Sequence, residues 1–230
     1  TIVSIYVNPT QFGENEDLST YPRDLDKDIA LLEKAGVDTV FFPSDQLMYP
    51  EDFKTWVSVA ELSTILCGKS RPNHFRGVTT IVIKLLNLIQ PKRIYLGEKD
   101  FQQLVILRTM VKDLNVNTEV IGCPLIREKD GLALSSRNKY LSPQGRKKAL
   151  CLYNSLMTAQ DMFKKGFIDP NIVLAEMKEV IESAGGKIDY LAAVDPQSLQ
   201  TVEILEQGVR ILTAVFIEDT RLIDNLELTM

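Results

Sequence analysis

The sequence has few of the residues that most often build metal and nucleophile sites. It contains one histidine, His74, and three dispersed cysteines, Cys67, Cys123 and Cys151. Without a second histidine or a Cys-x-x-Cys pair, we do not expect a zinc site. An odd number of scattered cysteines argues against a disulfide framework, so we expect free thiols and a reducing, cytoplasmic location. A catalytic triad or a Cys-His pair would depend on this single histidine.

Long apolar runs and an excess of positive charge are also lacking. No run approaches the ~20 residues that span a bilayer, and residues 1–7 lack a basic leader and a cleavage site. The net charge of −5 argues against a surface that coats nucleic acid. The glycine-rich phosphate loop and the dinucleotide-binding turn are absent as well. We therefore expect small-molecule ligands, with no membrane and no nucleic acid.

The first half of the sequence alternates strand-like and helix-like segments. Helical spacing covers 24–35, about 75–89 and the residues after Gly97, and β-branched or apolar runs indicate strands at 2–7, 39–42, 93–96 and 119–121. A short strand at 55–59 and a short helix at 61–67 are also predicted. This alternation favours a parallel sheet and predicts a doubly wound α/β unit.

The second half changes character. Ser142-Pro143 is typical of a helix start, with serine as the N-cap and proline in the first helical position. The patterns predict helices at about 143–165 and 170–184, and then strands at 188–194, 209–217 and 221–223. Helices followed by mostly antiparallel strands indicate a smaller α+β domain. We place the two domains at 1–125 and 126–230.

The stretch Gly97-Glu98-Lys99-Asp100 is the strongest candidate for a phosphate site. A glycine at a strand end lets the backbone turn tightly and approach a ligand, and the following helix N-terminus carries partial positive charge. Lys99 adds a full charge, while Gln102 and Gln103 bring amides that can bind hydroxyls or a carboxylate. By itself, the stretch fits an ordinary turn with a solvated charge cluster equally well.

Other polar residues follow predicted strand ends, where ligands of open α/β sheets bind. Asn8 and Gln11 come after the first strand, and they would meet Lys99, Asp100 and Gln103 in one crevice if the two strands are neighbours. A glutamine such as Gln11 is, in isolation, more often a solvated loop residue.

Two further segments concentrate donors. Residues 134–138 carry Ser135, Ser136 and Arg137, a combination that suits phosphate oxygens and could close over a nucleotide, although serine-capped turns are common. In residues 71–77, we favour a structural role for His74 over proton transfer and keep Arg71 as a candidate anion contact. Taken together, these groups suit nucleotidyl transfer, in which positioning and charge neutralisation do most of the catalysis.

These residues lie in stretches that closely resemble the pantoate–β-alanine ligase family. The matching stretches keep the order and spacing of the family over essentially the whole chain: 7–12, 21–23, 48–50, 71–78, 97–104, 130–138 and 221–225. The resemblance implies a Rossmann-like fold of the nucleotidyltransferase superfamily and a homodimer formed through the first domain. It also implies that pantoate and β-alanine are condensed at the expense of ATP through a pantoyl-adenylate, with release of pyrophosphate and then AMP.

The resemblance also assigns roles to residues. It implies that Gln11 and Gln103 hold pantoate, with Gln11 also beside β-alanine, and it leaves Asn8 and Arg71 as further substrate contacts. Mg²⁺ would bridge the phosphates, and Asp28 matches an acidic position near that ion, although an acid in a first helical turn usually serves the helix dipole. The residues implied to bind ATP are Gly97, Glu98, Lys99, Asp100, Ile126, Leu134, Ser135, Ser136 and Arg137, of which Lys99, Ser135, Ser136 and Arg137 would be catalytic.

The family begins with a Met-Gly-x-Leu-His-x-Gly-His turn, which gives two histidines to ATP, one of them the proton donor. This sequence starts after that turn. Because the later site residues are retained, we expect the turn to precede Thr1 in the intact protein, and a measured mass near 25.9 kDa would contradict this. The alternatives are a nucleotide- or pantoate-binding fragment with impaired catalysis and another adenylyltransferase of the same fold.

Overall fold

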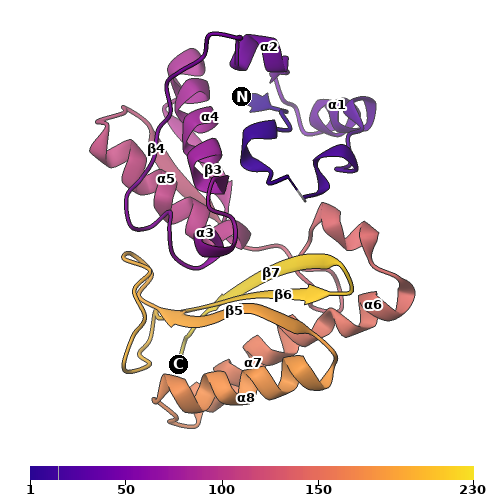
Figure 1. Cartoon of the computed structure of the whole chain (residues 1–230), viewed down its shortest axis with the longest axis vertical. Helices are drawn as coiled ribbons and strands as arrows, with labels where there is room; N and C mark the ends of the chain where they lie inside the picture. The colour runs from indigo at the N-terminus through magenta and orange to yellow at the C-terminus, as the bar shows by residue number, and fades with distance from the viewer. Residues whose placement is uncertain (15) are drawn as a thin grey trace.

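The computed structural model describes residues 1–14 and 16–230. The first half, in the upper part of Figure 1, contains two parallel strand pairs, in which Ile2 lies opposite Thr39 and Arg93 lies opposite Glu119. Its elements are β1 (Ile2–Ser4), η1 (Pro9–Gln11), η2 (Asp17–Ser19), α1 (Leu25–Lys34), β2 (Thr39–Phe41), α2 (Asp45–Met48), α3 (Cys67–Ser70), α4 (His74–Ile89), β3 (Arg93–Gly97), η3 (Glu98–Asp100), α5 (Phe101–Asp113) and β4 (Glu119–Cys123). The α/β class with parallel strands is confirmed.

The two strand pairs are separate two-stranded sheets in the described part of the chain. β1 is therefore not a hydrogen-bonded neighbour of β3, and the sheet neighbourhood on which we based a shared crevice is absent. Instead, η1 at the end of β1 packs against α4. The residues after β1 are therefore positioned by packing against α4 and not by pairing with β3.

The predicted strand at 55–59 and helix at 61–67 are wrong. Residues 53–59 have no regular structure, because α4 takes the hydrogen bonds that a strand partner would need: the Thr80 hydroxyl accepts from Val57 N at 3.0 Å, and the Thr79 hydroxyl donates to Val57 O at 2.6 Å. Residues 61–66 form turns in which Glu61 and Leu66 have positive φ, which interrupts a helix. The helix forms only at α3.

The second half, in the lower part of Figure 1, is a three-stranded antiparallel sheet in the order β5-β6-β7, packed against α7 and α8. Its elements are η4 (Ser136–Tyr140), α6 (Pro143–Lys148), α7 (Leu150–Lys164), α8 (Pro170–Ser183), β5 (Lys187–Val194), β6 (Arg210–Ile217) and β7 (Thr220–Glu227). The Ser142 hydroxyl caps α6 as predicted, accepting from Gly145 N at 2.9 Å. The single helix expected at 143–165 is two helices joined at the buried Ala149.

A hydrophobic cluster joins the two halves. Phe101, Leu104 and Val105 of α5 pack with Ala192 and Leu212 of the antiparallel sheet, and all five are buried. The first turn of α5, which directly follows Gly97–Asp100, is thereby held against the second half. The division at residue 125 into two domains stays a prediction. Among the described residues, no helix combines the length and the apolarity that a membrane crossing needs.

Candidate functional site

A pocket lies where the two halves meet. The start of α5, the start of α4, η4 with the segment before it, and strand β7 all contribute to its lining. It brings together many of the residues that the sequence singled out: Arg71, His74, Lys99, Asp100, Gln103, Ser135, Arg137 and Asn138. Cationic groups from both halves therefore face one cavity, as a phosphate site requires.

The turn before α5 is open toward ligands for a different reason from the one expected. Gly97 has φ of −69°, a value that any residue adopts, so the turn itself does not require glycine. A Cβ on Gly97 would nevertheless meet nothing within 4 Å. The Lys99 side chain is 21 % exposed, and its Nζ lies 3.9 Å from Asp100 Oδ2. The glycine leaves space beside the backbone, and Lys99 extends its charge into the pocket.

The two adjacent glutamines of α5 differ in environment. Gln102 is buried and uses its whole amide on the loop before α4: it accepts from Cys67 N at 3.1 Å and donates to Leu62 O and Ile65 O at 2.9 Å each. Gln102 also lines the pocket, but its amide is already engaged, and a ligand contact for Gln102 stays a prediction. Gln103 lines the pocket, and its side chain makes no hydrogen bond to the residues that the structure describes.

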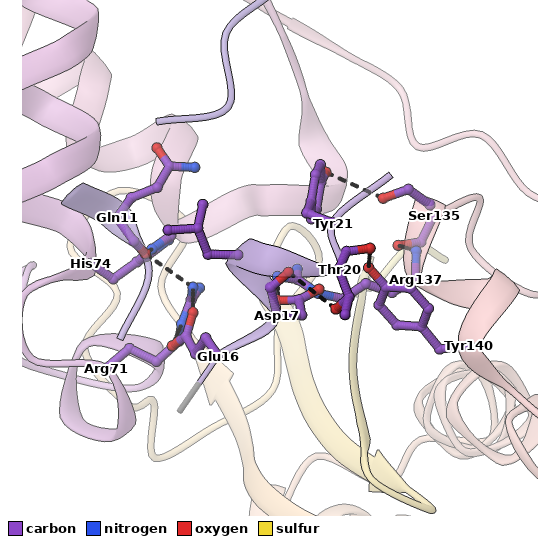
Figure 2. A network of polar contacts seen from close by, with 12 residues as sticks. Gln11, Glu16, Asp17, Thr20, Tyr21, Arg71, His74, Ser135, Arg137 and Tyr140 are labelled. Atoms are coloured by element: carbon purple, nitrogen blue, oxygen red, sulfur yellow. Dashed lines mark hydrogen bonds and ion pairs between the residues drawn. The ribbon is translucent and has the colours of Figure 1, made fainter. Parts of the chain in front are cut away.

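Gln11 is not among the residues that line the pocket, but its main chain contacts two that are. Its carbonyl oxygen accepts from Arg71 at 3.2 Å and lies 2.8 Å from His74 Nδ1, as Figure 2 shows. The Arg71 guanidinium also forms an ion pair with Glu16, with Nε 2.6 Å from Oε1. Burial opposes the charge on Glu16, but Arg71 holds the pKa of this carboxyl below its ordinary value. Arg71 thus shares its charge with a protein carboxylate, as Arg137 also does, and its role as an anion contact stays a prediction.

His74 has the structural environment that we favoured. It begins α4, and burial together with the nearby Arg71 charge lowers its pKa to about 4. The imidazole is therefore neutral at pH 7, and one ring nitrogen is engaged with Gln11. Asn8 is buried too: its side chain donates to Gly77 O at 3.1 Å and accepts from Thr10 N at 3.3 Å. A substrate contact for Asn8 stays a prediction.

The first residues of η4 contact the segment that follows β1. Arg137 makes a two-pronged ion pair with Asp17, at 2.8 and 3.0 Å. The Ser136 hydroxyl donates to the Tyr21 hydroxyl at 3.2 Å, and Ser135 caps η4 by accepting from Arg137 N. Tyr21, Ser135 and Arg137 lie toward the right of Figure 2, with Arg71, Glu16 and Gln11 toward the left. Burial works against the charge of Asp17, yet Arg137 holds its pKa below the ordinary value.

Other predicted residues lie outside the lining of this pocket. Ile126 and Leu134 are 65 % and 56 % exposed and pair through their main chains, with Leu134 N 2.9 Å from Ile126 O. Glu98 directs its carboxylate to Arg210, at 3.5 Å. Asp28 lies in the first turn of α1, and the described residues contain no cluster of three acidic, His or Cys side chains that could hold a metal ion. The three cysteines are free thiols.

Sequence reasoning missed the contribution of β7. Asp224 and Asn225 line the pocket and are 2 % and 4 % exposed. Arg127 binds the Asp224 carboxylate at 2.6 and 2.9 Å. Burial raises the pKa of Asp224, and the Arg127 guanidinium opposes that rise. The signal was present, because residues 221–225 form one of the stretches shared with the family, but the sequence assigned them no task.

Comparisons with known proteins agree over nearly the full chain. The family model described as pantoate-beta-alanine ligase matches residues 1–227. The pantothenate synthetase of Acetivibrio thermocellus is 51 % identical over 98 % of this chain and 81 % of its own length, and that of Ruminiclostridium cellulolyticum is 52 % identical over 97 % and 80 %.

Solved structures agree as well. A crystal structure of pantothenate synthetase from Thermus thermophilus has a TM-score of 0.95 and 46 % identity, covering 98 % of this chain and 82 % of that one. A pantoate–β-alanine ligase from Francisella tularensis, crystallised with an ATP compound and β-alanine, has a TM-score of 0.81 and 40 % identity over 98 % and 78 %. The chain described here belongs to the pantoate–β-alanine ligase family.

Proposed function

We propose that this protein joins pantoate to β-alanine at the expense of ATP. The observation that carries the proposal is the pocket lined by Lys99 and Arg137, from opposite halves of the chain, and by Gln103, whose amide has no partner among the described residues. About 50 % identity to pantothenate synthetases over nearly the whole chain supports the same activity. A fragment that only binds nucleotide is not favoured by these matches.

In the proposed first step, a pantoate carboxylate oxygen attacks the α-phosphorus of ATP. The new P–O bond forms as the bond to pyrophosphate breaks, and the product is pantoyl-adenylate. Negative charge develops on the phosphates, and fixed cations stabilise it most effectively where water is excluded. We assign this task to Lys99 and Arg137, with hydrogen-bond donors from Ser135 and Ser136. We place the bound ATP molecule against Gly97–Asp100, Ile126 and Leu134.

In the proposed second step, the β-alanine amine attacks the acyl carbon, the C–O bond to AMP breaks, and the amide forms. Gln103 would hold pantoate through its hydroxyl or carboxylate, and Gln11 would lie beside both substrates. The amide of Gln103 suits this task because it faces the pocket without a partner among the described residues. Asn8 and Arg71 would support Gln11, because Asn8 Nδ2 donates to Gln11 Oε1 at 3.3 Å and Arg71 donates to Gln11 O at 3.2 Å.

We also propose that ATP enters as its Mg²⁺ complex, that the protein works in the cytoplasm and that it forms a homodimer. Mg²⁺ commonly binds through substrate phosphates, water and one or two carboxylates, so it does not require a protein cage. Asp28 stays a candidate ligand, although it lies outside the pocket lining. No step above is assigned to the metal.

The test is AMP release from ATP that depends on both pantoate and β-alanine. Lys99→Ala should lower the rate by about a hundredfold, because one preorganised charge is lost from the transition state. Lys112→Ala, which removes an exposed lysine at the opposite end of α5, should stay within about twofold and serves as the matched control. ATP binding without turnover, or turnover that does not need β-alanine, would contradict the proposal.

A further inference from the structure

The side chain of Asn225 on β7 binds the backbone of the turn that carries Lys99. Asn225 Nδ2 donates to Glu98 O at 2.9 Å and to Lys99 O at 3.0 Å. The residue is 4 % exposed, so water does not compete easily for these carbonyl oxygens. One side chain of the second half thus anchors two consecutive peptide groups of the first half.

The orientation of this amide is fixed by its other partner. Asn225 Oδ1 accepts from Arg210 Nη1 at 3.2 Å. A reversed amide would place oxygen against two carbonyl oxygens and NH₂ against a guanidinium, so only one orientation satisfies every partner. Arg210 also lies 4.1 Å over the Phe101 ring, directly after the turn. The turn is therefore held at both ends by β6 and β7.

The neighbouring residue, Asp224, connects this anchor to the second cationic segment. Its carboxylate accepts from Asn225 N at 2.7 Å and receives both arms of Arg127. Arg127 Nη1 in turn donates to Gly131 O at 3.0 Å, only a few residues before Ser135. A part-buried chain of hydrogen bonds therefore runs from the Lys99 turn to Gly131, at the start of the segment that leads to Arg137.

We propose that Asn225 is a positioning residue for the nucleotide: it sets the Lys99 turn in register with the Ser135–Arg137 segment across the two halves. This inference rests on the proposed function, since it presumes that both segments contact one nucleotide. Asn225 acts through the backbone carbonyls and needs no contact with the phosphates. Misplacement of a binding group by about 1 Å can cost about a hundredfold in rate, so such an anchor matters.

The test compares Asn225→Asp and Asn225→Ala with Thr213→Val. Asn225→Asp keeps the side-chain shape but turns a carboxylate oxygen toward two carbonyl oxygens. It should therefore lower nucleotide affinity more than Asn225→Ala does. Thr213 is buried in the adjacent strand, opposite Asp224, and its hydroxyl has no partner among the described residues, which makes it the control. If Asn225→Asp does not fold, Asn225→Ser, which keeps one donor, takes its place and should fall between Ala and the wild type.

Calorimetry with a non-hydrolysable ATP analogue, and separately with pantoate, gives the decisive contrast. We expect nucleotide affinity to fall at least tenfold in Asn225→Asp, while pantoate affinity stays within twofold and amide hydrogen exchange of residues 97–103 becomes faster. Unchanged nucleotide affinity, or an equal loss of both affinities, would overturn the inference. A wild-type protein that binds no nucleotide would instead overturn the proposed function.

Discussion

Two adjacent glutamines show how finely roles are divided at the scale of single residues. Successive positions on an α-helix point about 100° apart. Both side chains reach the pocket lining, but only Gln102 directs its amide to the loop before α4. The two residues are of the same type and adjacent in the sequence, and only the packing around α5 gives their side chains different roles. The sequence could therefore predict that two glutamines begin this helix, but not which of them is engaged by the protein.

Exchanging each glutamine for alanine should separate stability from binding. Gln102→Ala leaves Cys67 N, Leu62 O and Ile65 O without their partner, which should lower the free energy of unfolding by about 1–3 kcal/mol. Gln103→Ala should leave stability within about 0.5 kcal/mol and weaken pantoate binding. Denaturant titration and calorimetry on both variants check this, and the reverse pattern would refute the assignment.

The single histidine gives a clean readout of the buried site. Its folded pKa of about 4 lies below the unfolded value of ~6.5, so the unfolded chain binds more protons between these values. His74 therefore contributes full stability above pH 6.5 and progressively less as the pH falls toward 4. Proton NMR should show a neutral imidazole down to about pH 5, and a titration midpoint near 6.5 would contradict this.

The matched variant is His74→Asn, which keeps a polar group near the position of Nδ1. Its free energy of unfolding should depend less steeply on pH between 6.5 and 4 than that of the wild type. Equal slopes would mean that His74 is not the group responsible.

At the scale of elements, alternation and capping signals predicted most helices and strands because these signals are local. Ser142 capped its helix, and the parallel and antiparallel classes agree with the predictions. The failures have distant causes: residues 55–59 lose their strand to the hydroxyls of Thr79 and Thr80. The site shows the same limit, since Asn225 reaches Glu98 across 127 positions of sequence.

Gly131 begins the segment that leads to the candidate phosphate loop, and replacing it should be costly. It has φ of +99°, and a Cβ there would lie 2.2 Å from the Tyr153 ring, over which Arg127 stacks. Gly166 has φ of +90° but nothing within 4 Å of its Cβ position. Gly166→Ala should therefore cost only backbone strain, about 1–2 kcal/mol.

Gly131→Ala should cost that strain plus about 1–3 kcal/mol for the forced shift of Tyr153. Denaturant unfolding of the two variants measures the difference. Equal destabilisation would show that Tyr153 yields without cost and that this segment is less firmly held than we argue.

At the scale of the whole molecule, apolar packing joins the two halves. The cluster of Phe101, Leu104 and Val105 with Ala192 and Leu212 is shared by both. Because loosely joined domains rarely share a buried core, we expect one cooperative thermal transition, with equal calorimetric and van't Hoff enthalpies. Two resolved transitions would instead favour independent domains at 1–125 and 126–230.

The central claim is that pantoate is activated as an acyl-adenylate in the pocket between these halves. Pantoate labelled with ¹⁸O in its carboxylate tests it most directly, with AMP analysed by mass spectrometry after turnover with ATP and β-alanine. The attacking carboxylate oxygen stays with the α-phosphorus when the amine displaces AMP, so one labelled oxygen per turnover should appear in AMP. Unlabelled AMP, or label found in inorganic phosphate with ADP as the nucleotide product, would contradict the account.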